Sequence, residues 1–248
     1  MIRTKHLDSV ANTWVIGDLH GYLKTLRALF EQINPKANDR IIFLGDLVDR
    51  GPDVKGCFDF IIEQRSKGLQ IDIILGNHDA LMLNAWEEEL TGTKRSFGFL
   101  RGKKPVLQKW LAMGGESTLA SFGVKKPSEI DPKYKDFLEK SYDYISTDEY
   151  LLVHAGFDFE SDSPFEDVEA MRWIREFKVD KAKSGGRSVI HGHTPVSFEF
   201  ICELVANPEK EAFLPLDHGV MLKNDREKGR LLEFNLEDRR LLSQGRLD

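Results

Sequence analysis

Residues 40 to 51 read RIIFLGDLVDRG and pass from an apolar run into a polar cluster. The β-branched run Arg40–Leu44 predicts a buried strand that ends at Gly45. The charged side chains of Asp46, Asp49 and Arg50 then follow the carboxyl end of that strand. Ligand sites in open α/β sheets collect at the carboxyl ends of strands. This stretch therefore indicates both a class of fold and the place of a site.

The same passage from strand to polar cluster recurs along the chain. Strands are also predicted over residues 13–16, 71–75, 149–153 and 187–190, and helical spacing appears over 22–33, 58–62, 106–112, 117–122 and 134–142. Strands that alternate with helices predict an α/β fold with a mostly parallel sheet. Short strands are expected near the C-terminus, with a hairpin over residues 230–242.

Five of the predicted strand ends carry residues that bind metals. The clusters read GDLHG (17–21), GDLVDRG (45–51), GNHD (76–79), HAG (154–156) and GHT (192–194). Their oxygen and nitrogen donors, without any thiolate, suit a divalent first-row ion. The candidate ligands are Asp18, His20, Asp46, Asn77, His154 and His193. Six ligands are too many for one open catalytic ion and fit two ions if one carboxylate bridges them. Asp46 is the natural bridge.

The charge of such a centre suits a phosphate substrate. Two divalent ions carry +4 and two carboxylates −2, so the site keeps about +2, which attracts phosphate and acidifies water. The whole chain has a formal net charge of −6, unlike proteins that bind nucleic acid through their overall field. A local positive site must therefore attract the substrate, and no nucleic-acid partner is expected.

These ordered motifs resemble the calcineurin-like metallophosphoesterases, and more narrowly the phosphoprotein phosphatase branch with its compact bacterial and phage members. The resemblance spans residues 15 to about 219 and includes the segment Trp110–Gly123. It implies a four-layer α/β/β/α sandwich in a single domain, 1–248, with a helical insert over about 84–145.

The resemblance also implies a role for each site residue. The first metal ion would be held by Asp18, His20 and Asp46, and the second by Asp46, Asn77, His154 and His193. His78, oriented by Asp49, would protonate the leaving oxygen, while Arg50 and Arg175 would bind phosphate oxygens. The two ions are expected to be Mn²⁺, with Fe and Zn as alternatives. A hydroxide that bridges the two ions would attack the phosphate directly.

The substrate is less well specified than the chemistry. The main interpretation is a Ser/Thr-type protein phosphatase that hydrolyses phosphate monoesters, because Asp49 is typical of that branch. The alternative is a hydrolase of dinucleoside polyphosphates such as diadenosine tetraphosphate, favoured by Leu75 and Asp79 on either side of the GNH motif. A catalytically silent scaffold is a distant alternative. The loops 91–104 and 158–167 would decide the choice.

Several other segments have plainer interpretations. The basic segment 94–104 is predicted as a solvated loop, with a substrate-gripping flap as the alternative. His191 and Trp110 are expected to pack in the interior, and Glu87–Glu89 to form a solvated helix end. Two cysteines, a polar N-terminus and no apolar run of about 20 residues predict a cytoplasmic protein without a membrane partner. The expected partner is a phosphorylated protein or a small phosphate-bearing molecule, and the oligomeric state is left open.

Overall fold

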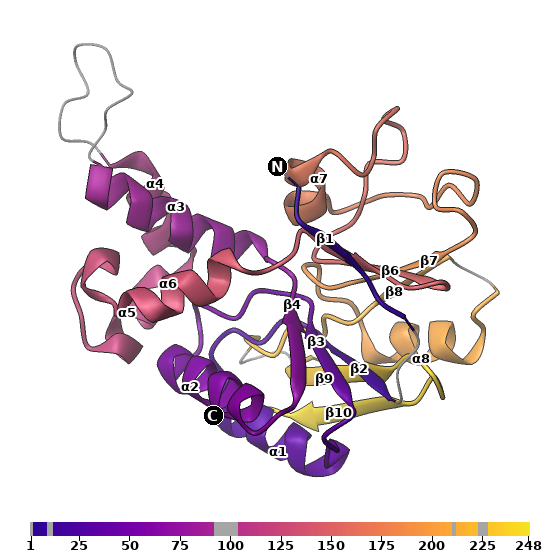
Figure 1. Cartoon of the computed structure of the whole chain (residues 1–248), viewed down its shortest axis with the longest axis horizontal. Coiled ribbons are helices and arrows are strands. Elements are labelled where there is room, and N and C mark those ends of the chain that lie inside the picture. The colour runs from indigo at the N-terminus through magenta and orange to yellow at the C-terminus, as the bar shows by residue number, and fades with distance from the viewer. Residues whose placement is uncertain (1, 9–11, 92–103, 210–211, 223–227) are drawn as a thin grey trace.

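Two five-stranded sheets lie face to face in the computed structural model, which describes residues 2–8, 12–91, 104–209, 212–222 and 228–248 (Figure 1). Sheet 1 has the strand order β10 (Leu241–Gly245), β9 (Arg230–Asn235), β2 (Thr13–Ile16), β3 (Arg40–Phe43) and β4 (Gln70–Ile73). Sheet 2 has the order β1 (Thr4–His6), β5 (Tyr144–Ser146), β6 (Tyr150–Val153), β7 (Ser188–His191) and β8 (Phe213–Pro215).

The sheets are mixed, whereas the strand and helix pattern predicted one mostly parallel sheet. In sheet 1, β2, β3 and β4 are parallel, but β9 runs antiparallel to β2 and pairs with β10 as the predicted hairpin. In sheet 2, β6, β7 and β8 are parallel, while β5 runs antiparallel to β6. The parallel strands of both sheets still end at one common edge, where the site lies.

Helices cover the outer faces and give the four-layer α/β/β/α sandwich, so that prediction is confirmed. The helices are α1 (Leu23–Ile33), α2 (Val54–Ser66), α3 (Asn77–Thr91), α4 (Pro105–Trp110), α5 (Glu116–Phe122), α6 (Pro132–Glu139), α7 (Val168–Trp173) and α8 (Phe198–Ala206). A π-helical turn, Leu111–Gly115, joins α4 to α5, and a 3₁₀ turn spans Pro127–Glu129. Figure 1 shows α1 and α2 outside sheet 1 and α3 to α6 gathered beside it.

Apolar side chains fill the space between the sheets. Val15 and Ile42 of sheet 1, with Leu44 just after β3, pack in one cluster with Leu152 and Ile190 of sheet 2. Because the strand residues alternate in direction, Ile16, Ile41 and Phe43 face the other way, towards α1 and α2. This interlayer core fixes the two sets of strand ends relative to each other.

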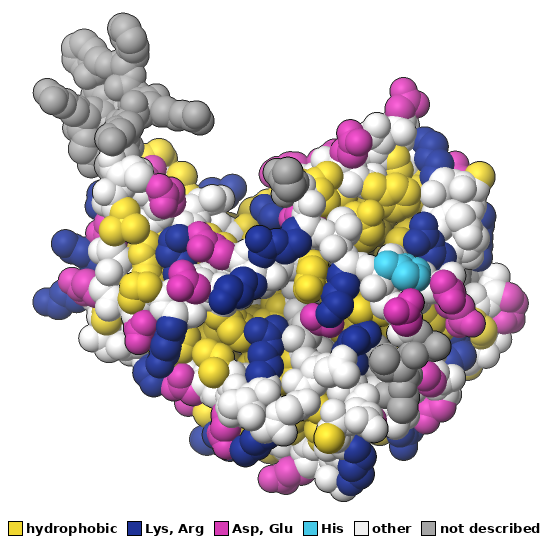
Figure 2. All heavy atoms as spheres, viewed as in Figure 1, with side chains coloured by type: hydrophobic (Ala, Val, Ile, Leu, Met, Phe, Trp, Pro, Cys, Tyr) yellow, Lys and Arg dark blue, Asp and Glu magenta, His cyan; other side chains and the backbone are white. Residues whose placement is uncertain are grey.

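The surface of the described residues carries charges of both signs. Figure 2 shows acidic and basic side chains interspersed over one face, with Lys and Arg gathered towards its middle. Ion pairs such as Lys5–Asp72 and Arg172–Asp143, at 2.8 and 2.7 Å, offset some of this charge. Among the helices of the described residues, none is long and apolar enough to cross a membrane. The basic segment 94–104, apart from Lys104, lies outside the described residues.

Candidate metal centre

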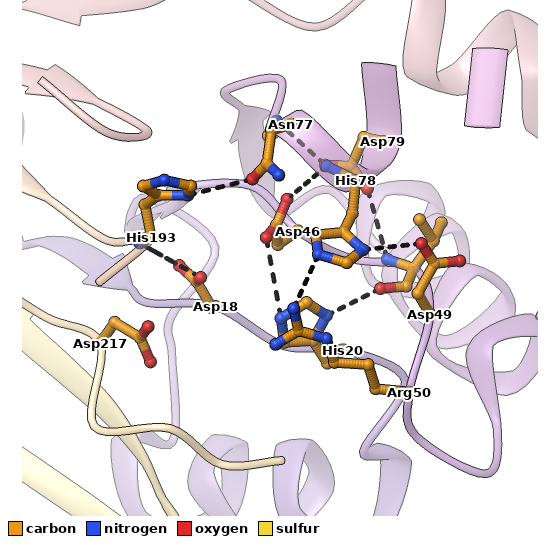
Figure 3. A network of polar contacts seen from close by, with 12 residues as sticks. Asp18, His20, Asp46, Asp49, Arg50, Asn77, His78, Asp79, His193 and Asp217 are labelled. Atoms are coloured by element: carbon orange, nitrogen blue, oxygen red, sulfur yellow. Dashed lines mark hydrogen bonds and ion pairs between the residues drawn. The ribbon is translucent and has the colours of Figure 1, made fainter. Parts of the chain in front are cut away.

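The polar side chains that follow β2, β3, β4, β6 and β7 converge at one edge of the sandwich. Figure 3 shows Asp46 near the middle of the group, Asp18 and His193 on one side, and His78 with Asp49 on the other. Asp18, Asp46, Asn77 and His154 are all buried, at 3%, 2%, 2% and 0% exposure. Buried polar side chains at this density require mutual hydrogen bonds or a bound cation.

The backbone at this edge is held in an unusual conformation. Eight non-glycine residues in the described part of the chain have positive φ, and five of them are predicted site residues. They are His20, Asp46, Asp49, Arg50 and His193. Non-glycine residues keep positive φ only where the surrounding structure enforces it, and such positions cluster at functional sites.

Asp46 belongs to both groups of converging metal donors. One group is His20, Asp46 and His78, the other is Asp46, His154 and His193, and within each the donor atoms lie within 4.8 Å of one another. Gly76 makes this possible, because a Cβ there would lie 2.2 Å from Asp46 Oδ1. A carboxylate shared by two groups is the arrangement that two neighbouring cations need.

The histidine hydrogen bonds show that these groups fit a cation. His154 Nδ1 donates to the carbonyl oxygen of Leu44 at 2.9 Å, and His20 Nδ1 to that of Val48 at 2.9 Å. The proton on Nδ1 leaves a lone pair on Nε2 of each neutral ring. In His154 that lone pair lies 2.9 Å from another acceptor, Asn77 Oδ1. Two lone pairs that face each other repel unless a cation lies between them.

His193 supports the same conclusion. Its Nδ1 lies 3.1 Å from Asn77 Oδ1, and its buried Nε2 meets no hydrogen-bond partner among the described residues. Burial lowers the pKa of both His20 and His193 to about 3, so both rings are neutral at pH 7 and can act as ligands. Burial opposes ionisation of Asp46, but His154, His78 and His20 outweigh it and hold the pKa of Asp46 below its ordinary value.

Asp18 lies beside these groups but in neither of them. Its carboxylate oxygens accept the backbone N–H of His193 at 3.1 and 3.2 Å. Burial, followed by repulsion from Asp217 and Asp46, raises the pKa of Asp18 well above its ordinary value. Asp217 is 1% exposed, and its Oδ2 has no hydrogen-bond partner within the described residues. Carboxylates buried together in this way favour a positive ion between them.

His78 and Asp49 form a buried pair on the other side of Asp46. His78 Nδ1 donates to Asp49 Oδ2 at 2.7 Å. Burial alone would lower the pKa of His78, but Asp46 and the hydrogen bond to Asp49 outweigh it and raise that pKa. A histidine held in its cationic form by a carboxylate can deliver a proton to a leaving group.

The helical segment after β4 holds Asp49 in place, a contact that the sequence did not predict. Trp110 Nε1 and Thr118 Oγ1 both donate to Asp49 Oδ1, at 3.0 and 2.7 Å, and the Asp49 N–H donates back to Thr118 Oγ1 at 2.9 Å. Trp110 does pack in the interior as expected, at 0% exposure. A buried tryptophan usually needs an acceptor for its indole N–H, so the sequence could have suggested that Trp110 has a polar partner.

Two arginines flank the centre. Arg50 Nη2 donates to His78 Nε2 at 3.0 Å, which places a guanidinium within hydrogen-bond distance of the predicted acid. Arg175 is exposed and lies just after α7, and its charge contributes to the lowered pKa of His193, of which burial is the main cause. Planar guanidinium groups match phosphate oxygens.

The remaining polar residues at this edge support the loops. Asp79 Oδ1 accepts the N–H of Leu47 at 2.9 Å, and its Oδ2 accepts that of Gly76 at 3.1 Å, so it ties two motif loops together. His191 packs between the rings of Phe177 and Phe213, as the sequence suggested, and belongs to neither donor group.

A sequence model of the calcineurin-like phosphoesterases matches residues 11–220. The chain belongs to this family. The donor groups and the mixed two-sheet sandwich are what the family relationship leads one to expect.

The relatives with a named activity are symmetrical bis(5'-nucleosyl)-tetraphosphatases. A symmetrical bis(5'-nucleosyl)-tetraphosphatase of Proteus mirabilis is 41% identical over 75 residues, which are 30% of this chain and 26% of that protein. The corresponding protein of Pectobacterium atrosepticum is 42% identical over 74 residues, 29% of this chain and 25% of that protein. The matches thus span about a quarter of the relatives' length.

Solved structures share the fold at low identity. A candidate diadenosine tetraphosphatase superimposes over 100% of both chains with a TM-score of 0.66 and 16% identity. A protein serine/threonine phosphatase from Saccharomyces cerevisiae covers 100% of this chain and 84% of its own, with a TM-score of 0.62 and 13% identity. Both kinds of enzyme are therefore built on the architecture seen here.

Proposed function

We propose that this protein is a metal-dependent phosphoesterase that hydrolyses a dinucleoside polyphosphate. The observation that carries the chemistry is the carboxylate of Asp46, which belongs to two groups of converging donors at once. The observation that favours the substrate is the 41% identity to a symmetrical tetraphosphatase. The motif around Gly76 agrees with this substrate, since Leu75 and Asp79 stand where protein phosphatases usually carry Arg and Glu.

The proposed ligands of two divalent ions are Asp18, His20, Asp46, Asn77, His154 and His193. When bound, the ions would supply positive charge that binds phosphate oxygens and makes water nucleophilic at neutral pH. The protein's part is to present neutral imidazoles and ionised carboxylates at fixed positions. The Nδ1 hydrogen bonds of His20 and His154 to backbone carbonyls provide that orientation.

The proposed general acid is His78. Hydrolysis adds the oxygen of water to one phosphorus and breaks its bond to the bridging oxygen, which leaves with the other half of the substrate and takes up a proton. Asp49 holds the His78 ring and favours its cation. Arg50 now donates to His78 Nε2, and a bound phosphate would compete for that guanidinium. Arg50 would then move to the phosphate oxygens and leave Nε2 free to carry its proton.

A second candidate is hydrolysis of phosphate monoesters on proteins. The Asp49–His78 pair at 2.7 Å favours it, because an alkoxide leaving group needs a proton more than a nucleoside phosphate does. We rank it second because its structural relative shares only 13% of residues, a level that supports the fold alone.

The test is a direct competition between substrates. Metal-free protein is reconstituted with Mn²⁺, and kcat/KM is measured for diadenosine tetraphosphate and for a phosphoserine peptide. We expect a preference of at least about tenfold for the dinucleotide, which corresponds to about 1.4 kcal/mol of transition-state binding. A preference of that size for the peptide would support the second candidate, and inactivity on both would reject both substrates.

A matched pair of variants checks the centre itself. Asp46→Asn is expected to lose activity on either substrate and to retain less of both metals, since Asp46 is shared. Asp148→Asn, whose side chain is 95% exposed, is the control and should behave as the unaltered protein. Full metal content and activity in Asp46→Asn would exclude the shared-ligand role.

A further inference from the structure

A small aromatic pocket opens beside the metal centre. Its volume is about 230 Å³, and it lies between the segment after α7, the end of β7, β8 and α8. Thr194 in its wall directly follows His193, which belongs to the second donor group. Arg175 also lines the pocket. One end of the pocket is therefore the place where phosphate is proposed to bind.

Four aromatic side chains line the pocket. Phe177, His191, Phe200 and Phe213 line it, with centroid distances of 5.2 Å for Phe177–His191 and 6.0 Å for His191–Phe213. The ring of Phe177 is fixed against the backbone of Gly156, where a Cβ would lie only 2.4 Å from Phe177 Cε1. Phe177 and His191 meet edge to face, whereas His191 and Phe213 are tilted. Such a set of rings offers stacking to a flat aromatic ligand.

Among these four rings, Phe200 is the one whose position is not explained by packing of its helix, α8, against the core. Its neighbours in α8, Ile201 and Leu204, point into the core at 0% and 4% exposure, whereas Phe200 is 37% exposed. It is one of three large apolar side chains classed as exposed in the described part of the chain, with Leu90 and Leu247. The exposed ring of Phe200 beside an aromatic pocket would be removed from water if a ligand bound there and covered it.

The polar groups at the rim are few and specific. Glu176 and its sequence neighbour Arg175 both line the pocket, so it offers a carboxylate acceptor as well as a cation that can bind phosphate. A purine with an exocyclic amine satisfies this combination, because the amine donates to the carboxylate while the ring stacks. At about 230 Å³ the pocket is smaller than the roughly 300 Å³ needed for a drug-sized ligand, so it fits one part of a substrate.

We propose that this pocket binds the nucleobase of a nucleoside whose phosphates lie on the metal centre, with Phe200 and Phe177 as the stacking residues. This inference rests on the proposed function, because it assigns the base of the same substrate. It makes the pocket a specificity site, since a phosphate compound without a base would gain nothing from it.

The experiment measures binding, so that it stands apart from turnover. Adenosine diphosphate and inorganic pyrophosphate are titrated by calorimetry into the Mn²⁺-loaded protein. We expect the nucleotide to bind roughly tenfold more tightly, the size of effect that base stacking on an aromatic side chain gives. Phe200→Ala should reduce that ratio to near one, and Leu247→Ala, an exposed apolar side chain away from the pocket, should preserve it.

The outcomes separate this inference from the proposed function. Equal affinities of the two ligands in the unaltered protein, or an unchanged ratio in Phe200→Ala, would overturn the base pocket even if diadenosine tetraphosphate is a substrate. A ratio that collapses in Phe200→Ala upholds the pocket even if turnover favours the peptide. A third ligand is a phosphoserine peptide with an aromatic residue beside the phosphoserine. If Phe200→Ala weakens binding of this peptide but not of adenosine diphosphate, the pocket is a peptide site and the proposal is overturned.

Discussion

At the scale of single residues, Thr118 offers the sharpest test of how the proposed acid is held. Its hydroxyl donates to Asp49 Oδ1 at 2.7 Å and accepts the Asp49 N–H at 2.9 Å, all within a buried site. Thr118→Val keeps the shape and removes both bonds, of which the one to the charged Asp49 carboxylate is worth about 1.5–3 kcal/mol. We expect hydrolysis of esters with poor leaving groups to slow about tenfold or more, and p-nitrophenyl phosphate to change little.

Thr118→Ser is the matched control, because it retains the hydroxyl. It should keep the rate on both classes of ester, as measured by kcat in parallel assays. If the valine variant slows both substrates equally, Thr118 supports the fold of the site and does not act through the proton donor.

The sequence predicted the residues of the centre better than their supports. Asp46, His154 and His193 lie together because each follows a strand of a common edge, which the motif spacing indicated. Trp110 and Thr118 reach Asp49 across 61 and 69 positions of sequence, so no local pattern could reveal them. His78 belongs to the first donor group and Asp18 does not. This difference likewise depends on side-chain directions, which a sequence does not specify.

At the scale of elements, α4 depends on a neighbouring helix for its start. Lys104 at its N-terminus makes no side-chain cap, and Glu88 of α3 accepts the N–H of Leu107 at 2.9 Å and lies 3.4 Å from that of Val106. The expectation of a plain solvated helix end at Glu87–Glu89 is therefore wrong for Glu88, which is half-buried and caps α4 from outside that helix. It is also wrong for Glu89, whose side chain accepts the Ser128 N–H at 3.2 Å and pairs with Lys104 at 3.3 Å.

Glu88→Ala should lower the free energy of unfolding by about 1 kcal/mol, the usual cost of a lost cap. Because α4 carries Trp110, the same change should slow esters with poor leaving groups. Denaturant unfolding and parallel kinetics measure the two effects. Glu87→Ala removes an exposed neighbour of the same type and should do neither; equal effects from the two variants would argue against the cap.

The sequence predicted helices and strands correctly where the apolar pattern was strong, and missed the short, polar strands at the edge of sheet 2. The strand at Thr13–Ile16 has the predicted bounds, since a continuous apolar run between polar residues leaves little choice. The edge strand β1 is only three residues long, and its first and third residues are exposed, so it carries no apolar pattern. β5 is similarly short and is defined by its pairing with β1 and β6.

At the scale of the whole molecule, Glu233 in β9 links stability to pH. It is 0% exposed and its carboxylate has no hydrogen-bond partner among the described residues, with the charge of Arg240 as the opposing influence. Burial raises its pKa from 4.5 to about 9. The folded protein therefore keeps a proton that the unfolded chain releases, so this group makes the free energy of unfolding fall as pH rises from 4.5 towards 9.

Glu233→Gln removes the ionisation and should flatten that dependence. We expect the variant to gain stability relative to the unaltered protein at pH 8.5, and less or nothing at pH 5, when Tm is followed by calorimetry at both values. Glu31→Gln, on the exposed side of α1, should leave the pH dependence as it was. An unchanged slope in Glu233→Gln would mean that Glu233 is already ionised in the fold.

The division of the metal donors between the layers has a consequence for folding. Asp18, Asp46 and Asn77 follow strands of sheet 1, whereas His154 and His193 follow strands of sheet 2. The second donor group draws from both sheets, so it exists only while the interlayer core holds them in register. The affinity for the proposed ions would therefore report on how firmly the two sheets are docked. Any change that loosens the sheets, however far from the site, would separate Asp46 from His154 and His193.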